Sequence, residues 1–147
     1  MTDDKVVVKV KRISGDAFLP KKAKEDDAAF DLFAAEDYLL MSQARYAVST
    51  GIALEIPRGF EGQVRPRSGL SLSHGITLVN APGTIDSGYR GEVKVILQNL
   101  GQDGFYIKRG MRIAQLAIRP VPDVSFVEVD ELVDSDRGEG GFGSTGV

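Results

Sequence analysis

The chain has 147 residues, of which 42% are hydrophobic, and this length and composition indicate one globular domain. It has no cysteine, which excludes disulfides, thiolate nucleophiles and cysteine-ligated metals, and its single histidine, His74, excludes multi-histidine metal sites. A net charge of −3 argues against a general nucleic-acid binder. No signal peptide or membrane-spanning run is evident, so we expect a cytoplasmic protein.

Alternation of apolar and polar residues with a period of two dominates the chain and predicts about ten short strands. On the segment 47–54 it places Val48, Thr50, Ile52 and Leu54 on one face. The segment 92–99 is mostly apolar and could be buried on both faces. The strands that the pattern indicates lie at 6–10, 47–54, 60–65, 76–79, 92–99, 112–118 and 125–129. This pattern favours an all-β barrel or jelly-roll-like domain.

Two segments depart from the strand pattern. The segment 68–75 predicts one or two helical turns that Ser68 would cap and Gly75 would end. The last ten residues are half glycine, which is too little apolar surface to fold alone. We therefore predict a β domain over residues 1–136 and a flexible tail over residues 137–147.

Several polar residues have both a structural and a functional interpretation. Asp31, between two aromatics, could form a salt bridge or an Asx turn, or could support Mg²⁺ through water. Arg67 precedes a predicted helix start, where it could be solvated or bind phosphate. Gln115 could face water or bind a ligand oxygen. Phe142 is stranded among glycines, either in a frayed tail or poised to stack on a base. His74 is interpreted as a structural residue.

The segment 83–92, GTIDSGYRGE, also has both a structural and a functional interpretation. Its glycines and the carboxylate of Asp86 near its middle fit the tip of a hairpin. They also fit an active site in which Asp86 is a general base and Tyr89 contacts a ligand. The segment by itself leaves both interpretations open.

Five motifs in a fixed order resemble those of the trimeric, all-β dUTP pyrophosphatases (dUTPases). They are AAFDLFAA at 28–35, PRSGLS at 66–71, NAPGTIDSGYRGE at 80–92, GMRIAQL at 110–116 and RGEGGFGSTG at 137–146. The resemblance spans residues 5–147, and its third and fifth motifs are long and specific. It implies a dUTPase-like β-clip fold.

This resemblance implies hydrolysis of dUTP to dUMP and pyrophosphate with Mg²⁺, which limits uracil incorporation into DNA and supplies dUMP for thymidylate synthesis. Asp86 would activate the water that attacks the α-phosphorus, and Tyr89 would pack on the deoxyribose and exclude a 2′-hydroxyl. The other substrate-binding residues that it implies are Arg67, Ser68, Gly69, Asn80, Thr84, Ile85, Lys94, Gln115, Arg137, Phe142, Gly143, Ser144 and Thr145.

The resemblance also implies a homotrimer with shared active sites, in which residues 137–147 act as a lid. We expect neither a membrane nor a nucleic acid as a direct partner. A dCTP deaminase, or a bifunctional dCTP deaminase and dUTPase on the same fold, is the alternative, although such chains tend to be longer and to lack the complete tail. A non-catalytic nucleotide-binding protein is a further alternative.

Overall fold

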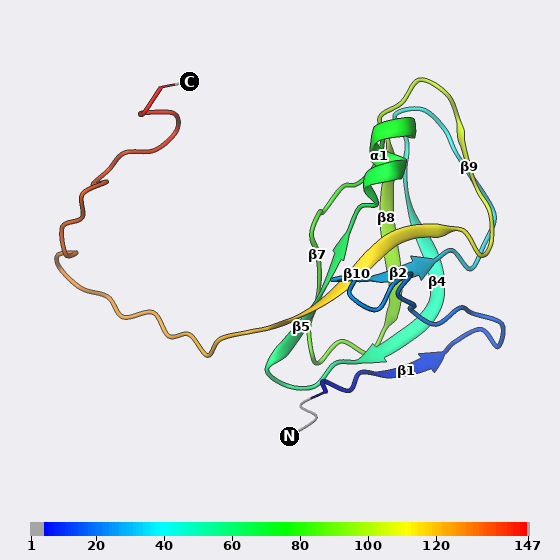
Figure 1. Ribbon diagram of the computed structural model, residues 1–147, viewed down its shortest axis with the longest axis horizontal. Coiled ribbons are helices and arrows are strands. Elements are labelled where there is room, and N and C mark those ends of the chain that lie inside the picture. Colours follow the sequence, from blue (N-terminus) through cyan, green and yellow to red (C-terminus); the bar gives the residue numbers. More distant parts are fainter. Residues whose placement is uncertain (1–4, 147) are drawn as a thin grey trace.

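The computed structural model describes residues 5–146 (Figure 1). Its regular elements are ten strands and one short helix. In chain order they are β1 (Lys9–Arg12), β2 (Phe30–Phe33), β3 (Tyr38–Leu40), β4 (Arg45–Glu55), β5 (Phe60–Arg65), α1 (Ser68–His74), β6 (Ile76–Leu78), β7 (Gly83–Ile85), β8 (Glu92–Asn99), β9 (Phe105–Ile107) and β10 (Arg112–Pro120). Residues 1–4 of the predicted domain and residue 147 of the predicted tail lie outside the described residues. The prediction of an all-β fold with one short helix is confirmed.

Two antiparallel four-stranded sheets form the body, and both combine strands that are distant in the sequence. One sheet has the order β1-β4-β8-β6 and the other β2-β10-β5-β7, while β3 and β9 form a two-stranded sheet. The consecutive strands β7 and β8 therefore belong to different sheets. Crossing between two sheets is typical of a jelly roll, and the strands of residues 5–146 do not pair into one closed barrel.

The core lies between the sheets and is built largely from the alternating faces of β4 and β8. The four residues predicted to share one face of β4 are all buried. Val48 and Ile52 are fully enclosed, and Thr50 and Leu54 are nearly so. β8 buries every second residue, but Lys94 between them is exposed. The expectation that β8 could be buried on both faces is therefore wrong, since only one face meets the core.

The strongest periodic segments were predicted most accurately. β5 and β8 coincide with the predicted segments 60–65 and 92–99, and 47–54 lies within β4. Of the strands of three or four residues, β6 was predicted at 76–79 and β1 in part, whereas β2, β3, β7 and β9 were not predicted. Such strands contain too few residues to establish a period of two, and their partners in space decide that they pair.

Two predicted strand segments are wrong in part or entirely. β1 begins at Lys9, although the apolar run begins at Val6. The segment 125–129 forms no strand, and Phe126 within it is 97% exposed. An extended apolar segment becomes a strand only beside a pairing partner, and the described residues of the single chain offer none there.

The helix α1 begins one residue earlier than its predicted cap requires. Arg67 occupies the N-cap position in an extended conformation and makes no side-chain capping bond, so Ser68 is the first helical residue instead of the cap. Gly75 ends the helix as predicted, with a left-handed φ of 70°. A Cβ atom there would also lie 2.8 Å from the Gly101 amide nitrogen. Glycine is therefore required both by the left-handed backbone and by the lack of space for a side chain.

An irregularity in β4 between Ser49 and Ala53 is stabilised by two carboxylates. The ladder to β8 shifts there, and the Ser49 and Gly51 amides donate to Glu36 (2.8 Å) and Glu92 (2.9 Å). The Tyr46 hydroxyl donates to the other oxygen of Glu36 at 2.8 Å. This hydrogen bond, followed by burial, raises the pKa of Tyr46, since the phenolate would face a carboxylate. The carboxylates thus replace ladder bonds that the irregularity removes.

The segment after β10 leaves the body in an extended conformation (Figure 1). Residues 121–139 are exposed, and several short turns follow, such as that closed by the Gly140 amide on the Arg137 carbonyl at 3.1 Å. Phe142 is fully exposed. Within residues 5–146 we find no helix with the length and hydropathy needed to cross a membrane.

Candidate active site

Residues 80–92, which we call the crossover segment, connect the two sheets instead of forming a paired hairpin. β7 pairs with β5 through Gly83–Ile85, whereas β8 pairs with β4 and, only over Leu97–Asn99, with β6. Among the described residues, the β8 edge at Val93 and Lys94 has no strand partner on the side away from β4. The predicted hairpin is therefore wrong as a ladder, because each arm is bound to a different sheet.

A pocket of about 330 Å³ lies between these separated arms. Four residues predicted to bind substrate line it: Thr84 and Ile85 from β7, Tyr89 from the turn and Lys94 from β8. Ala47, Glu92, Val93 and Ile96 complete the lining. Separating two strands exposes backbone donors and acceptors along their edges, so this pocket can hydrogen-bond a flat polar ligand through the main chain.

Asn80 lies at the start of the crossover segment, close to β7. A side chain at Gly83 would come within 3.1 Å of the Asn80 amide nitrogen, so the absence of a side chain there admits the Asn80 side chain. The Ala81–Pro82 peptide bond between them is cis. Asn80 therefore lies beside β7, although it is not among the residues that line the pocket.

The turn of the crossover segment is fixed by hydrogen bonds at its tip. The Tyr89 amide donates to the Asp86 carbonyl at 3.1 Å, and the Arg90 guanidinium donates to the Ser87 carbonyl at 2.7 Å. Arg90 also lies 4.0 Å from a carboxylate oxygen of Glu55 on β4. The turn that carries Asp86 and Tyr89 is thus stabilised by hydrogen bonds within it and by the ion pair between Arg90 and Glu55 on β4.

Asp86 itself faces a second pocket of about 400 Å³. Arg58 in the loop between β4 and β5 and Glu61 on β5 line one side, and Val121 to Asp123, directly after β10, line the other. The carboxylate is exposed and makes no side-chain hydrogen bond within residues 5–146. Asp86 and Tyr89 therefore mark two sides of the same turn, one polar and open to water, the other lining the pocket between β7 and β8.

Three of the motifs meet at a cationic cluster, which we define as Arg67 and Arg112 around Asp31. The Asp31 carboxylate is 3.9 Å from Arg67 Nε and 3.7 Å from an Arg112 terminal nitrogen, and the Asp31 residue is only 7% exposed. Arg67 Nε is buried and finds no hydrogen-bond acceptor among the described residues. Two guanidinium groups share one carboxylate, so the cluster keeps an excess of positive charge that can attract an anion.

Gln115 and the start of α1 lie beside this cluster. Gln115 on β10 is in register with Asp31 on β2 and with Arg65 on β5. Ser68 and Gly69 are exposed at the first turn of α1, directly after Arg67. The predicted phosphate-binding residues of two motifs are therefore brought together with Asp31, although the sequence places them far apart.

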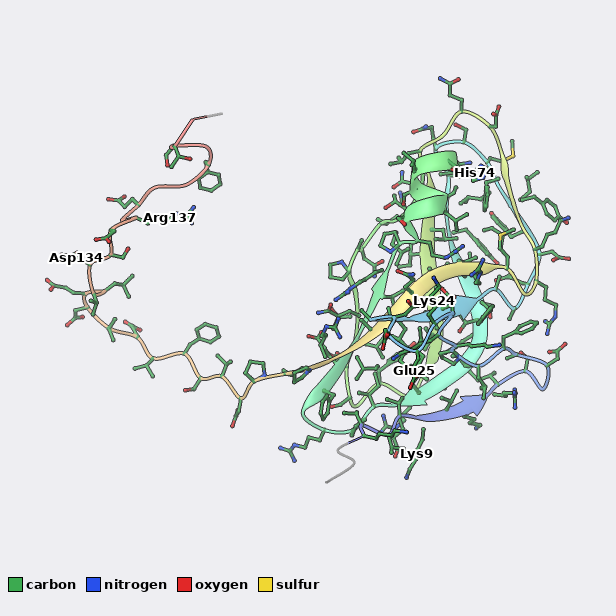
Figure 2. The ribbon with its side chains drawn as sticks, viewed as in Figure 1. Lys9, Lys24, Glu25, His74, Asp134 and Arg137 are labelled. Atoms are coloured by element: carbon green, nitrogen blue, oxygen red, sulfur yellow. The ribbon has the colours of Figure 1, made fainter. Side chains whose placement is uncertain are left out.

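The tail residues are not brought to either pocket. Figure 2 places Arg137 on the tail and away from the body, and Phe142 to Thr145 continue beyond it. Among residues 5–146, Arg137 Nε donates only to the nearby Gly140 carbonyl, at 2.7 Å. The single chain therefore presents the predicted site in separate parts.

Arg112 and Glu92 contribute to the candidate site but were not predicted as site residues. Arg112 lies within the GMRIAQL motif, and its cationic side chain between apolar neighbours was an available signal. Glu92 was visible only as the end of GTIDSGYRGE, and its contacts to β4 depend on tertiary structure. His74, interpreted as structural, is exposed and packs on Phe105 with ring centroids 5.1 Å apart.

The described side chains could bind Mg²⁺ only together with a ligand that supplies most of the coordinating oxygens. No group of three or more acidic or histidine side chains lies together in residues 5–146. Asp31, predicted to support the metal through water, already has two guanidinium partners. Mg²⁺ commonly keeps several waters and binds through substrate phosphates, which is compatible with the absence of a cage in this part of the chain.

Comparison with known proteins identifies a family over most of the chain. The family model described as dUTPase matches residues 16–146. The deoxyuridine 5′-triphosphate nucleotidohydrolase of Clostridium kluyveri is 59% identical over 137 residues, which cover 93% of this chain and 96% of that protein. The protein of the same name from Zymomonas mobilis is 53% identical over 145 residues, covering 97% and 99% respectively.

Solved structures show the same similarity in three dimensions. A mutant dUTPase of Staphylococcus bacteriophage 80alpha, solved with dUpNHpp, has a TM-score of 0.90 and 30% identity, covering 96% of this chain and 99% of that chain. A mutant dUTPase of the S. aureus phage phi11, described with a structural Mg(II) ion, has a TM-score of 0.80 and 25% identity, covering 85% and 97%.

The cationic cluster yields a prediction about stability. Asp31→Asn keeps the side-chain shape but leaves two guanidinium groups without their shared carboxylate, so unfolding should become easier by about 1–3 kcal/mol. Urea unfolding followed by circular dichroism measures this change. Asp26→Asn, on an exposed loop, is the matched control and should stay within about 0.5 kcal/mol of the unsubstituted protein. Equal midpoints for the two variants would show that Asp31 contributes nothing through its arginines.

Proposed function

The chain belongs to the dUTPase family, and we propose that it hydrolyses dUTP to dUMP and pyrophosphate. The observation that carries this proposal is the pocket between the unpaired arms β7 and β8, with Asp86 and Tyr89 at the turn that joins them. The phage 80alpha relative, solved with dUpNHpp, supports a nucleotide as the ligand. The reaction would limit uracil incorporation into DNA and supply dUMP for thymidylate synthesis.

Uracil recognition is assigned to the strand edges of the pocket. The uracil ring presents one N–H donor between two carbonyl acceptors, a pattern that main-chain groups near Thr84 and Ile85, together with Asn80, can complement. Cytosine reverses part of this pattern and would leave buried polar groups without partners, which costs more than losing a favourable contact. The narrow space between the arms would also exclude the methyl group of thymine.

Tyr89 is assigned to the sugar. Its ring forms one wall of the pocket, and its hydroxyl donates to the Glu92 carbonyl at 2.8 Å, which holds the ring in place. A ring packed against the C2′ carbon of deoxyribose leaves no space for a 2′-hydroxyl. Lys94, exposed on β8 across the pocket, would contact the nucleotide from the other side.

Asp86 is assigned as the general base. Its carboxylate would accept a proton from a water molecule as the water oxygen bonds to the α-phosphorus. The bond from that phosphorus to the bridging oxygen then breaks, and pyrophosphate leaves with the electron pair. A single carboxylate open to water is sufficient for this step.

The triphosphate is assigned to the cationic cluster and its neighbours. Arg67, Ser68, Gly69 and Gln115 would hold the phosphates, and the buried Arg67 Nε without an acceptor supports this role. Mg²⁺, when bound to the phosphates, would neutralise their charge and favour departure of pyrophosphate. Asp31 would hold Arg67 in place and support the metal region through water.

A homotrimer with shared sites would bring these parts together. In a single chain the tail, on which Arg137 is labelled, lies away from the body (Figure 2). The segment that leads to it exposes apolar side chains such as Phe126 and Leu132. A neighbouring subunit would cover such side chains. Residues 137–147 would then act as a lid on the domain 1–136, with Phe142 on the base and Gly143, Ser144 and Thr145 along the phosphates.

The decisive experiment measures pyrophosphate release from dUTP with Mg²⁺ and compares UTP, dCTP and dTTP. We expect release from dUTP only, in a protein that acts in the cytoplasm without a membrane or nucleic-acid partner. The relatives named above are dUTP nucleotidohydrolases, so a dCTP deaminase has no support among them. Ammonia release from dCTP would overturn the assignment, and binding without turnover would indicate a non-catalytic protein.

Asp86→Asn should retain dUTP binding while kcat falls by several orders of magnitude, because the amide cannot accept the proton of the attacking water. Pre-steady-state and steady-state assays with dUTP, together with calorimetric binding of a non-hydrolysable analogue, measure the two effects separately. Asp123→Asn, in the same pocket, is the matched control and should leave kcat unchanged. Undiminished turnover of Asp86→Asn would remove Asp86 from its role.

Deletion of residues 137–147 should abolish most activity and leave the assembled body intact, since the described residues 137–146 lie away from the sheets (Figure 1). Steady-state turnover of dUTP reports the loss. Circular dichroism and sedimentation provide the control, because secondary structure and subunit number should match those of the full chain. A truncated protein with normal turnover would contradict the lid.

A further inference from the structure

We propose that Gly91 is a positioning residue for the Tyr89 ring and thereby sets the discrimination between deoxyribose and ribose. This inference rests on the proposed function, and it adds a residue that neither the motif comparison nor the pocket lining assigns. The reason lies in the space above Gly91, which the tyrosine ring occupies.

A side chain at residue 91 cannot coexist with the observed ring. A Cβ atom on Gly91 would lie 2.5 Å from the Tyr89 hydroxyl oxygen, 2.7 Å from Cζ and 2.9 Å from Cε1. Cβ atoms essentially never approach other heavy atoms below 3.0 Å. The ring therefore rests directly on the backbone of Gly91, and a methyl group there would displace it.

Turn geometry does not account for this glycine. The positive-φ glycines of the described residues do not include Gly91, so its backbone conformation is open to other residues. Gly88, in the same turn, has open space where a side chain would be. Within this turn, Gly91 is distinguished by its contact with Tyr89.

The support beneath the ring is rigid. The Tyr89 hydroxyl donates to the Glu92 carbonyl at 2.8 Å, and Glu92 begins β8 in register with Ala53 of β4. The Glu92 carboxylate accepts from the Gly51 amide at 2.9 Å and also from the Ser49 hydroxyl. Because Glu92 is held by β4 and Gly91 directly precedes it, we expect the ring rather than the backbone to move when a side chain is added.

Displacement of the ring should weaken selectivity more than it weakens folding. The clash involves the far end of a half-exposed side chain, so the ring can swing away while the turn keeps its hydrogen bonds. Tyr89 is one wall of the pocket, and moving that wall alters the space beside C2′ of the sugar. A displaced Tyr89 ring packs less well on deoxyribose and excludes ribose less strictly.

The test is Gly91→Ala, with Gly88→Ala as the matched control. The ratio of kcat/KM for dUTP to kcat/KM for UTP should fall about tenfold or more in Gly91→Ala, a size typical of a small steric change in a pocket. The ratio should stay within about twofold of the unsubstituted protein in Gly88→Ala. In a Tyr89→Ala background, Gly91→Ala should cause no further fall, because the ring through which it acts is absent.

Tyr89→Phe provides a second test that leaves residue 91 unchanged. It removes the hydroxyl that anchors the ring to the Glu92 carbonyl, and we expect a smaller fall of the same ratio. Unchanged ratios in both Gly91→Ala and Tyr89→Phe would overturn the proposal, as would equal effects of Gly91→Ala and Gly88→Ala. If the unsubstituted protein does not prefer dUTP to UTP, the proposed function itself fails, and this outcome is distinct from the others.

Discussion

The chain crosses from one sheet to the other between β7 and β8, and this crossing is the constraint on which the candidate site depends. β7 is bound to β5 and β8 to β4, and within residues 5–146 no ladder joins Gly83–Ile85 to Val93 and Lys94. Within residues 5–146 the backbone edges between them have no strand partner, so they are available to a ligand. A paired hairpin with the same sequence would have satisfied those groups internally and closed the pocket.

The crossing also explains why the irregularity in β4 matters to the site. The carboxylates of Glu36 and Glu92 replace ladder bonds around Ser49 and Gly51, and Glu92 is at the same time the first residue of β8. Its carbonyl accepts the Tyr89 hydroxyl. Glu92 therefore links three parts of the site: β8, which lines the pocket, the irregular strand β4, and the Tyr89 ring.

The cationic cluster has a different basis, because it comes from the register within one sheet. β10 lies between β2 and β5, so Gln115 is opposite both Asp31 and Arg65. Arg67 and Arg112 then reach the same buried carboxylate from two directions. Neither guanidinium is neutralised completely, and this excess of positive charge is what suits the cluster to phosphate groups in the proposed reaction.

Local pattern was sufficient where an element is long or its conformation is special. β5 and β8 alternate over six and eight residues and were predicted with their bounds, and Gly75 was recognised as a helix end. Short strands such as β7, and the failure of 125–129 to form one, could not be predicted. Whether three or five extended residues become a strand depends on a partner that the local sequence does not specify.

The sequence by itself determined the family, and motif order and residue type also point to the carboxylate of Asp86, the aromatic Tyr89 and the glycine-rich tail with Phe142. Only the tertiary structure decided that β7 and β8 do not pair, that Asp31 is shared by two arginines and that Gly91 lies under the Tyr89 ring. The physical reason is that residue type sets what a group can do, whereas long-range strand pairing sets which groups meet.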